Sequence, residues 1–216
     1  MNKYILFDLD GTLTDSLLGI TRCIQYALKK SGVEEPDLEK LKSFCGPPLR
    51  VTFKGNYGFD DAKAERAVAY YRERYIDVGM WENAAFPGMV ELVRDLKSAG
   101  RHCAVATSKP ENFACMIVAK YGFMLHLDTC CGCSLDGKTD AKWLVVREAL
   151  RRLHVEDLSE AVLVGDRYND VEAAHKCGIK CIGVGFGYGG KQELADWGCD
   201  YYTETVEDLR RLLMEM

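Results

Sequence analysis

The 216-residue sequence lacks a long apolar run, a run of basic residues and an internal repeat. Without an apolar stretch of membrane-spanning length, no contact with a membrane is expected. The formal net charge of −5 gives no electrostatic footprint for a nucleic acid polymer. The first predicted strand begins at residue 4, which leaves no room for a signal peptide. We therefore expect a cytoplasmic protein that binds neither a membrane nor a nucleic acid polymer.

Metal-binding patterns of histidine and cysteine are also missing. The four histidines share no spacing that is typical of metal ligands. The ten cysteines are scattered, and several lie inside apolar runs, where they behave as small hydrophobic residues. The cluster Cys130-Cys131-Gly132-Cys133 has no second cysteine or histidine pair at zinc-finger spacing. We expect these cysteines to be reduced, and those of the cluster to pack at the end of a strand.

Nearly half of the residues, 48%, are hydrophobic, which is enough for a sizeable core. The chain is longer than the usual single domain and short for two large ones, which favours one domain with a substantial insertion. Residues 17–83 show helical periodicity and no strand signal. Residues 1–16 and 84–216 alternate strands with helices, a pattern typical of an α/β fold with a parallel sheet. Strands are predicted near residues 4–7, 102–107, 127–131, 161–165, 180–184 and 200–202.

The most informative stretch is the first strand and the turn after it. Four apolar residues, Tyr4-Ile5-Leu6-Phe7, are followed by Asp8 and Asp10, whose side chains point the same way if the chain stays extended. Two carboxylates so close together repel and need a cation or a proton between them. An ordinary strand-end turn explains the same residues equally well when they are taken alone.

Further polar residues follow the later strands. Since ligands of open α/β sheets bind beyond the carboxyl ends of the strands, these residues should lie near Asp8 and Asp10. They are Thr107-Ser108-Lys109, Lys138, Lys142, Asp166 and Asp170. Carboxylates suit Mg²⁺, and hydroxyl and lysine groups suit a phosphate dianion. A carboxylate can also attack phosphorus, while a second one transfers protons.

Four segments resemble the motifs of the haloacid dehalogenase-like (HAD) hydrolases. Asp8-Leu9-Asp10-Gly11-Thr12 matches the DxDGT signature, and Thr107-Ser108-Lys109, Lys142 and Gly165–Asp170 resemble the second, third and fourth motifs in order. The resemblance implies a Rossmann-like three-layer core over residues 1–16 and 84–216 and a small helical cap over 17–83. Within this family, the sequence is similar to the branch that contains phosphoglycolate phosphatases and 5′-nucleotidases. The implied activity is Mg²⁺-dependent hydrolysis of a small phosphomonoester through an aspartyl-phosphate.

The resemblance also implies a role for each matching residue. Asp8 is the expected nucleophile, Asp10 the general acid and base, and Asp166 a third ligand of Mg²⁺ beside both. The expected supporting residues are Asp170 and Thr12, and the expected phosphate-binding residues are Thr107, Ser108, Lys142 and the Leu9 amide. Lys138 remains a rival to Lys142. In the cap, a loop over Gly46–Arg50 is expected to touch the leaving group, with Pro48, Arg50 and Lys54 as candidate contacts.

Two alternatives remain open. A phosphosugar mutase has the same core, and a receiver-like phospho-aspartate signalling module uses similar aspartates, although it lacks a helical insertion of this length. The glycine run Gly185–Gly190 satisfies GxGxxG, but it lies too late in the chain for a complete dinucleotide-binding unit. We interpret it as a flexible loop. The expected oligomeric state is a monomer or a homodimer, and the sequence does not name the substrate.

Overall fold

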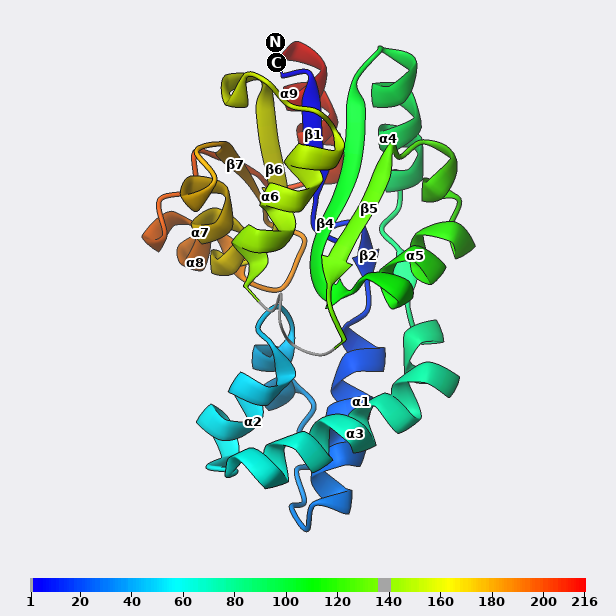
Figure 1. Cartoon of the computed structure of the whole chain (residues 1–216), viewed down its shortest axis with the longest axis vertical. Coiled ribbons are helices and arrows are strands. Elements are labelled where there is room, and N and C mark those ends of the chain that lie inside the picture. Colours follow the sequence, from blue (N-terminus) through cyan, green and yellow to red (C-terminus); the bar gives the residue numbers. More distant parts are fainter. Residues whose placement is uncertain (1, 136–140) are drawn as a thin grey trace. The chain divides into compact units, whose positions relative to one another are not determined.

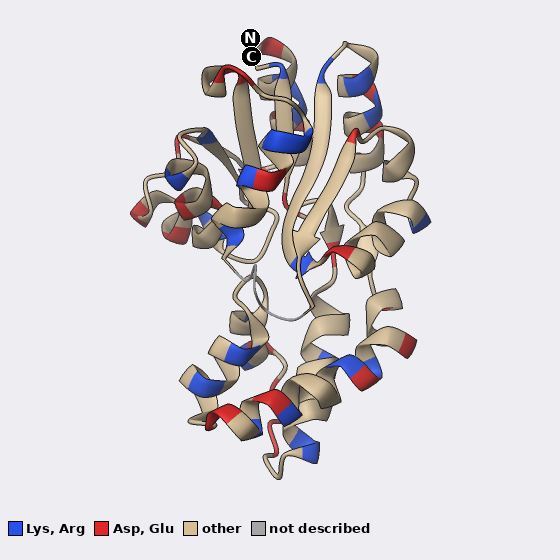
Figure 2. Cartoon of the chain, viewed as in Figure 1, with Lys and Arg blue, Asp and Glu red and all other residues tan. Residues whose placement is uncertain are grey.

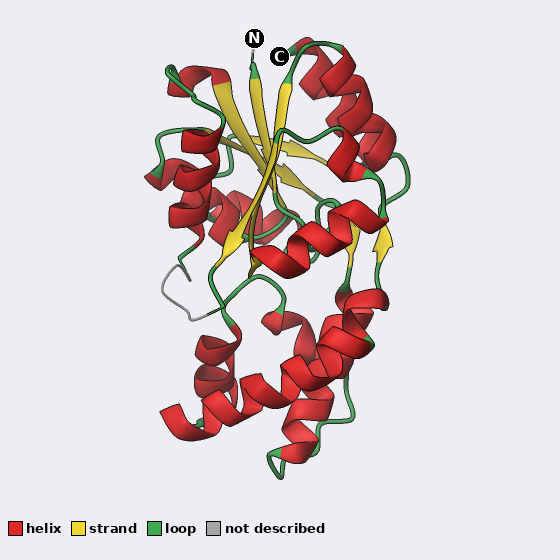
Figure 3. Ribbon diagram, turned by 45° about the vertical axis from the view of Figure 1, so that its right-hand side comes forward, coloured by secondary structure: helices red, strands yellow, loops and turns green. Residues whose placement is uncertain are grey.

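The computed structural model describes residues 2–135 and 141–216. It divides into two compact units: the first comprises Met1–Thr14 and Ala85–Met216, and the second comprises Asp15–Ala84. The chain passes between them through two short strands that pair with each other, β2 (Thr14–Asp15) and β3 (Ala84–Ala85). Figure 3 shows that the second unit is built of helices, whereas the large sheet belongs to the first.

The first unit is built on a six-stranded sheet with the order β5-β4-β1-β6-β7-β8. All its neighbouring strands run parallel (Figure 1). The strands are β1 (Tyr4–Phe7), β4 (His102–Pro110), β5 (Thr129–Cys133), β6 (Ala161–Gly165), β7 (Lys180–Val184) and β8 (Tyr201–Thr203). Strand β1 is buried along its whole length because it lies between β4 and β6, which explains its unbroken apolar sequence. The α/β prediction with a parallel, Rossmann-like sheet is confirmed.

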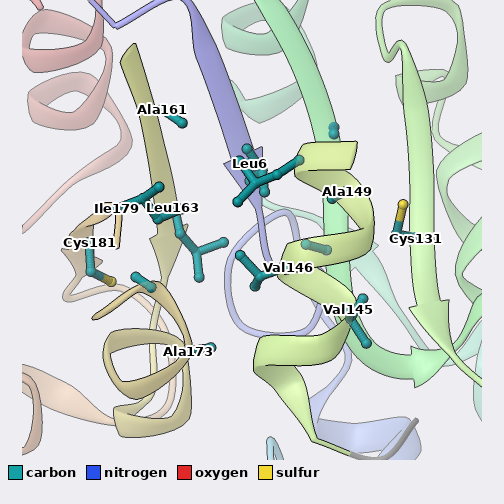
Figure 4. Close-up of a cluster of buried hydrophobic side chains, with 14 of the residues drawn as sticks. Leu6, Cys131, Val145, Val146, Ala149, Ala161, Leu163, Ala173, Ile179 and Cys181 are labelled. Atoms are coloured by element: carbon teal, nitrogen blue, oxygen red, sulfur yellow. The ribbon is translucent and has the colours of Figure 1, made fainter. Parts of the chain in front are cut away.

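Helices cover both faces of this sheet and complete three layers (Figure 1). They are α4 (Met89–Ser98), α5 (Glu111–Lys120), α6 (Lys142–Arg152), α7 (Tyr168–Lys176), α8 (Gly190–Asp196) and α9 (Val206–Glu215). On one face, Val145, Val146 and Ala149 of α6 point toward Leu6 and Leu163 of the sheet (Figure 4). Such close packing of α6 on the sheet fixes the position of the first turn of α6, where Lys142 lies.

The cysteine cluster is part of this packing. Cys130, Cys131 and Cys133 lie on β5, and all three side chains are buried. Burial raises the pKa of the Cys131 thiol to about 11, so this thiol stays protonated at neutral pH. The prediction that the cluster packs at the end of a strand agrees with these positions.

The second unit contains α1 (Leu17–Lys30), α2 (Leu49–Tyr57) and α3 (Asp61–Asp77), and α1 packs along α3. The helix α2 was not predicted, and a loop was expected over Gly46–Arg50; the helix instead begins directly after Pro48. This segment has a low intrinsic helix propensity, because it contains the weak helix formers Val51, Thr52, Gly55 and Asn56. Packing compensates, because the ring of Phe53 stacks on Phe59 at 5.8 Å between centroids.

Acidic and basic residues are interspersed along the helices of each unit (Figure 2). Among the residues that the structure describes, no helix combines the length and the apolar character needed to cross a bilayer. Short exposed ion pairs between neighbouring turns, such as Lys176 with Glu172 at 2.8 Å, account for part of this mixed surface.

Candidate active site

The register of the sheet brings the predicted residues to one edge. Phe7, the last residue of β1, pairs with Val105 of β4 and with Val164 of β6. The next residue, Asp8, donates its amide to the Val164 carbonyl at 2.9 Å, so it lies level with the end of β6. Asp166 follows that end directly, and Thr107 follows Val105 two residues later. Parallel strands of matched register therefore gather three segments that are far apart in the sequence.

The turn after β1 is tight and leaves no room for a side chain at its centre. The Leu9 carbonyl accepts the amides of Leu13 at 3.0 Å and Thr14 at 2.9 Å. Gly11 adopts a positive φ of 84°, and a Cβ there would lie 2.2 Å from Oδ2 of Asp166. Glycine is therefore required both for the backbone conformation and for the close approach of Asp166. The hydroxyl of Thr12 lies 3.4 Å from Oδ1 of Asp166, which is a long hydrogen bond.

Three buried carboxylates meet at this edge: Asp8, Asp166 and Asp170 each offer an oxygen within 4.8 Å of the others. Lys142 lies among them, with its Nζ 2.7 Å from Oδ1 of Asp8 and 2.7 Å from Oδ1 of Asp170. Its side chain is only 4% exposed. The first turn of α6 thus supplies a cation that bridges the nucleophile candidate and the supporting aspartate.

Burial and mutual repulsion perturb the ionisation of this cluster. Burial, reinforced by Asp170 and Asp8, raises the pKa of Asp166 well above its usual range. Burial also raises the pKa of Asp170 to about 6, although Lys142 opposes the shift. Burial alone would lower the pKa of Lys142, but the two aspartates outweigh it and hold that pKa above its ordinary value. Lys142 is therefore charged at neutral pH.

The donor set suits a divalent cation. All three candidate ligands are carboxylate oxygens, which hard cations such as Mg²⁺ prefer. When fully ionised, three carboxylates and one ammonium carry a net charge of −2. Burial, with repulsion between the carboxylates as a smaller cause, raises the pKa values of Asp166 and Asp170. A buried site with this charge fits a cation of charge +2. No other group of three or more potential metal ligands occurs within residues 2–135 and 141–216.

Asp10 has a different partner, which sequence analysis did not assign. Its Oδ2 lies 2.9 Å from Nζ of Lys109, and both side chains are largely buried. Lys109 follows Thr107 and Ser108 at the end of β4, where the pairing with β5 becomes irregular between Ala106 and Pro110. The Thr107 hydroxyl accepts the Lys109 amide at 3.3 Å within this irregular end. Part of the sequence signal was present, since Lys109 stands in the polar segment Thr107-Ser108-Lys109 at the end of β4.

The predicted residues of the second unit are held by partners of their own unit. Arg50 of α2 pairs with Glu65 of α3. Lys54, also of α2, has its Nζ 2.6 Å from Oδ1 of Asp61, the first residue of α3. Substrate contact by Pro48, Arg50 and Lys54 stays a prediction, and Lys138 lies outside the described residues.

The glycine-rich segment after β7, which we interpreted as a flexible loop, makes specific contacts at this edge of the sheet. The amide of Tyr188 donates to Oδ2 of Asp166 at 2.7 Å. A Cβ on Gly187 would lie 2.2 Å from Cβ of Asp166 and 2.4 Å from the Gly11 carbonyl. The segment therefore packs directly against the turn after β1 and against Asp166. Periodicity and motif matching do not reveal such a role, because it depends on which strand ends lie side by side.

Comparison with known proteins places these features in context. Residues 5–184 match the family model described as haloacid dehalogenase-like hydrolase. A protein of Pseudomonas aeruginosa named 5′-nucleotidase is 43% identical over 97% of this chain and 94% of its own length. The Mycobacterium tuberculosis protein named tyrosine-protein kinase PtkA is 37% identical over 98% of this chain and 72% of its own length. Phosphoglycolate phosphatase 1 of Pseudomonas aeruginosa is 28% identical over 98% and 78% of the two lengths.

A solved structure has the same fold over the whole chain. The crystal structure of a predicted phosphatase from Clostridium acetobutylicum superposes with a TM-score of 0.97, covers 100% of both chains and is 39% identical. This similarity extends to both units as each is defined above.

Proposed function

Because the chain belongs to the haloacid dehalogenase-like hydrolase family and is a phosphatase of that family, we propose that it hydrolyses a small phosphomonoester through an aspartyl-phosphate on Asp8. The observation that carries this proposal is the buried contact of Lys142 with both Asp8 and Asp170, beside Asp166. It supports a nucleophile that is held in place at the end of β1, beside a lysine that can bind a phosphoryl oxygen.

In the first step, a carboxylate oxygen of Asp8 attacks phosphorus while the bond from phosphorus to the ester oxygen breaks. The electron pair of that bond leaves with the alkoxide, which takes a proton from Asp10. In the second step, water attacks the phosphorus of the aspartyl-phosphate and gives its proton to the Asp10 carboxylate. The bond from phosphorus to Asp8 then breaks, inorganic phosphate is released, and both aspartates return to their starting state.

Other residues of the chain bind the phosphoryl oxygens in this proposal. Lys142 neutralises charge on the phosphoryl group and orients Asp8, which it already contacts at 2.7 Å. The Thr107 hydroxyl and the amides of Leu9 and Ser108 donate hydrogen bonds to the equatorial oxygens, where charge accumulates in the transition state. Lys109 contacts Asp10 at 2.9 Å, so it orients the group that transfers protons.

Asp8, Asp166 and the Asp10 carbonyl would hold a Mg²⁺ ion, with Asp170 in support. When bound, such an ion neutralises the developing negative charge on the phosphoryl oxygens and orients the substrate.

Among substrates, we propose a nucleoside 5′-monophosphate before phosphoglycolate. The relative named 5′-nucleotidase is more similar to this chain than the one named phosphoglycolate phosphatase, and it matches over nearly its full length. A phosphosugar mutase remains the alternative within the same chemistry. The receiver-like interpretation loses its support, because the family model that matches spans most of the chain, including the helical insertion.

The test is phosphate release from a panel of nucleoside monophosphates, phosphoglycolate and sugar phosphates by wild-type and Asp8→Asn protein. We expect Asp8→Asn to lower kcat by at least about 10³-fold, because the amide cannot form the phosphoryl intermediate. Asp196→Asn is the control, since Asp196 is an exposed carboxylate on α8. Circular dichroism checks that both variants stay folded. Wild-type turnover by a folded Asp8→Asn protein would refute the mechanism.

A further inference from the structure

Glu193 of α8 contacts the beginning of α7, although 25 residues separate them from each other in the chain. One oxygen, Oε1, accepts the Tyr168 amide at 2.9 Å and the Arg167 Nε–H at 2.8 Å. Tyr168 is the first residue of α7, and its amide is one of those that a helix leaves without an internal partner. Glu193 therefore caps α7 from outside and neutralises Arg167 at the same time.

The same helix start carries one of the clustered carboxylates. Asp170 is the third residue of α7, and its Oδ2 accepts the Arg167 amide at 3.1 Å. Its other oxygen, Oδ1, contacts Lys142. Two carboxylates thus hold successive amides at this turn: Asp170 binds that of Arg167, and Glu193 binds that of Tyr168. The position of Asp170 therefore depends on the geometry of this turn, which the two hydrogen bonds fix.

Asp166 precedes this turn directly and is held from the same side. The Tyr188 amide, from the segment that leads into α8, donates to its Oδ2 at 2.7 Å. A Cβ on Gly189 would lie 2.4 Å from the Asp166 carbonyl and 2.8 Å from Oε1 of Glu193. Only glycine lets the start of α8 approach so closely. The segment from Gly187 to Glu193 therefore forms one clamp around Asp166, Arg167 and Tyr168.

Ring packing fixes α8 in this arrangement. Trp197, four residues after Glu193, lies against the Tyr168 ring with 4.9 Å between the ring centroids. Residues four apart lie on the same side of a helix, so Glu193 and Trp197 both face the beginning of α7. The Arg167 side chain is 10% exposed, and Glu193 is 27% exposed. This ion pair is less exposed than pairs on the surface, and the hydrogen bond from the Tyr168 amide to the same oxygen restrains its geometry further.

We propose that Glu193 is a positioning residue that sets Asp166 and Asp170 for divalent cation binding. It acts through the Tyr168 amide and through Arg167. Without the Glu193 carboxylate, Arg167 loses this ion pair and the Tyr168 amide loses its acceptor, so the turn that carries Asp166 and Asp170 is held less firmly. The proposal rests on the Mg²⁺ requirement of the function proposed above. It assigns a role in that function to α8, which carries none of the matched motifs.

Isothermal titration of Mg²⁺ into EDTA-treated, dialysed full-length protein tests this role without using activity. We expect Glu193→Ala to raise the Kd about tenfold, as is typical when a group that orients metal ligands is removed. Glu193→Gln keeps an oxygen for the Tyr168 amide but no charge for Arg167, so a smaller rise of about threefold is expected. Asp196→Ala is the matched control, because it removes an acidic residue from the exposed side of the same helix.

If Glu193 only caps α7, Glu193→Ala lowers the thermal unfolding temperature and leaves the Kd for Mg²⁺ unchanged. A Glu193→Ala protein that is folded by circular dichroism and binds Mg²⁺ within twofold of wild type overturns the inference. If Glu193→Ala does not fold, Glu193→Gln decides, and a Kd equal to that of wild type overturns it. Absence of Mg²⁺ binding by the wild-type protein is a different result: it refutes the metal-dependent function and this inference with it.

Discussion

Asp8 and Asp10 stand two residues apart, yet each has its own lysine. Lys142 contacts Asp8 from the beginning of α6, whereas Lys109 contacts Asp10 from the end of β4. Both lysine side chains are almost completely buried. Two neighbouring aspartates thus have lysine partners from separate elements. This separation matches the different tasks proposed for them, because the nucleophile and the proton-transfer group must be oriented independently.

The role of Lys109 can be tested by removing its charge. Lys109→Met leaves Asp10 without the ammonium that lies 2.9 Å from it. We expect kcat to fall by about 10²-fold with little change in KM, because proton transfer by a misoriented acid is impaired while phosphate binding persists. Steady-state phosphate release measures both constants. Lys29→Met, at an exposed position of α1, is the control. A kcat equal to that of wild type would show that Lys109 only packs.

Several residues of the predicted site could be named from sequence because they stand at the end of a strand or directly after it. Asp8 and Asp166 follow β1 and β6, Thr107 lies near the end of β4, and apolar runs reveal those strands. The contact between Lys109 and Asp10 was beyond such reasoning. It depends on how the irregular end of β4 turns the side chain, and no sequence period encodes that. The roles assigned to individual residues remain predictions until variants are measured.

At the scale of elements, segments with weak periodicity were the difficult ones. The helix α2 is held by aromatic packing and not by helix propensity, so its sequence resembled a loop. The segment Gly185–Gly190 was misjudged for the opposite reason: its glycines suggested flexibility, whereas Gly187 permits contact with Asp166. Tertiary contacts decided both cases, and one sequence does not show them.

Close packing at Gly187 predicts a sharp penalty for one methyl group. In Gly187→Ala the new Cβ would overlap Cβ of Asp166 and the Gly11 carbonyl, so the segment or the turn after β1 must shift. We expect a loss of about 1–3 kcal/mol of stability and weaker Mg²⁺ binding. Thermal unfolding and Mg²⁺ titration measure the two effects.

Gly55→Ala is the matched control for this substitution. Gly55 lies within α2, and nothing lies within 4 Å of the position of its added Cβ. Alanine should therefore stabilise the helix by about 0.5–1 kcal/mol and leave Mg²⁺ binding unchanged. Equal effects of the two substitutions on unfolding would contradict the proposed packing at Gly187.

For the whole molecule, the buried acidic cluster couples stability to pH and to cations. The pKa of Asp170 is raised to about 6, above the ordinary value for aspartate, and that of Asp166 is raised as well. Between about pH 4 and 6 the folded protein therefore holds protons that the unfolded chain has released. Stability contributed by these groups is present at the acidic end of this window and is lost as the pH rises through the folded pKa.

In EDTA, we accordingly expect the contribution of the cluster to the free energy of unfolding to fall as the pH rises from about 5 to 7. Carboxyl groups with a lowered pKa change stability only at lower pH. An example is Glu148, whose pKa is lowered to about 2 by its hydrogen bond with Arg151. Mg²⁺ should reverse the trend, because it binds the ionised carboxylates. At 100 times its Kd it adds about 2.7 kcal/mol, and less at pH 5 where protons compete.

Urea unfolding followed by circular dichroism at pH 5, 6 and 7, with EDTA or Mg²⁺, measures both effects. Asp170→Asn removes one titrating group, so its slope in EDTA should be shallower than that of wild type. A wild-type protein whose stability in EDTA has the same slope as Asp170→Asn, and which Mg²⁺ stabilises equally at pH 5 and 7, would contradict this coupling.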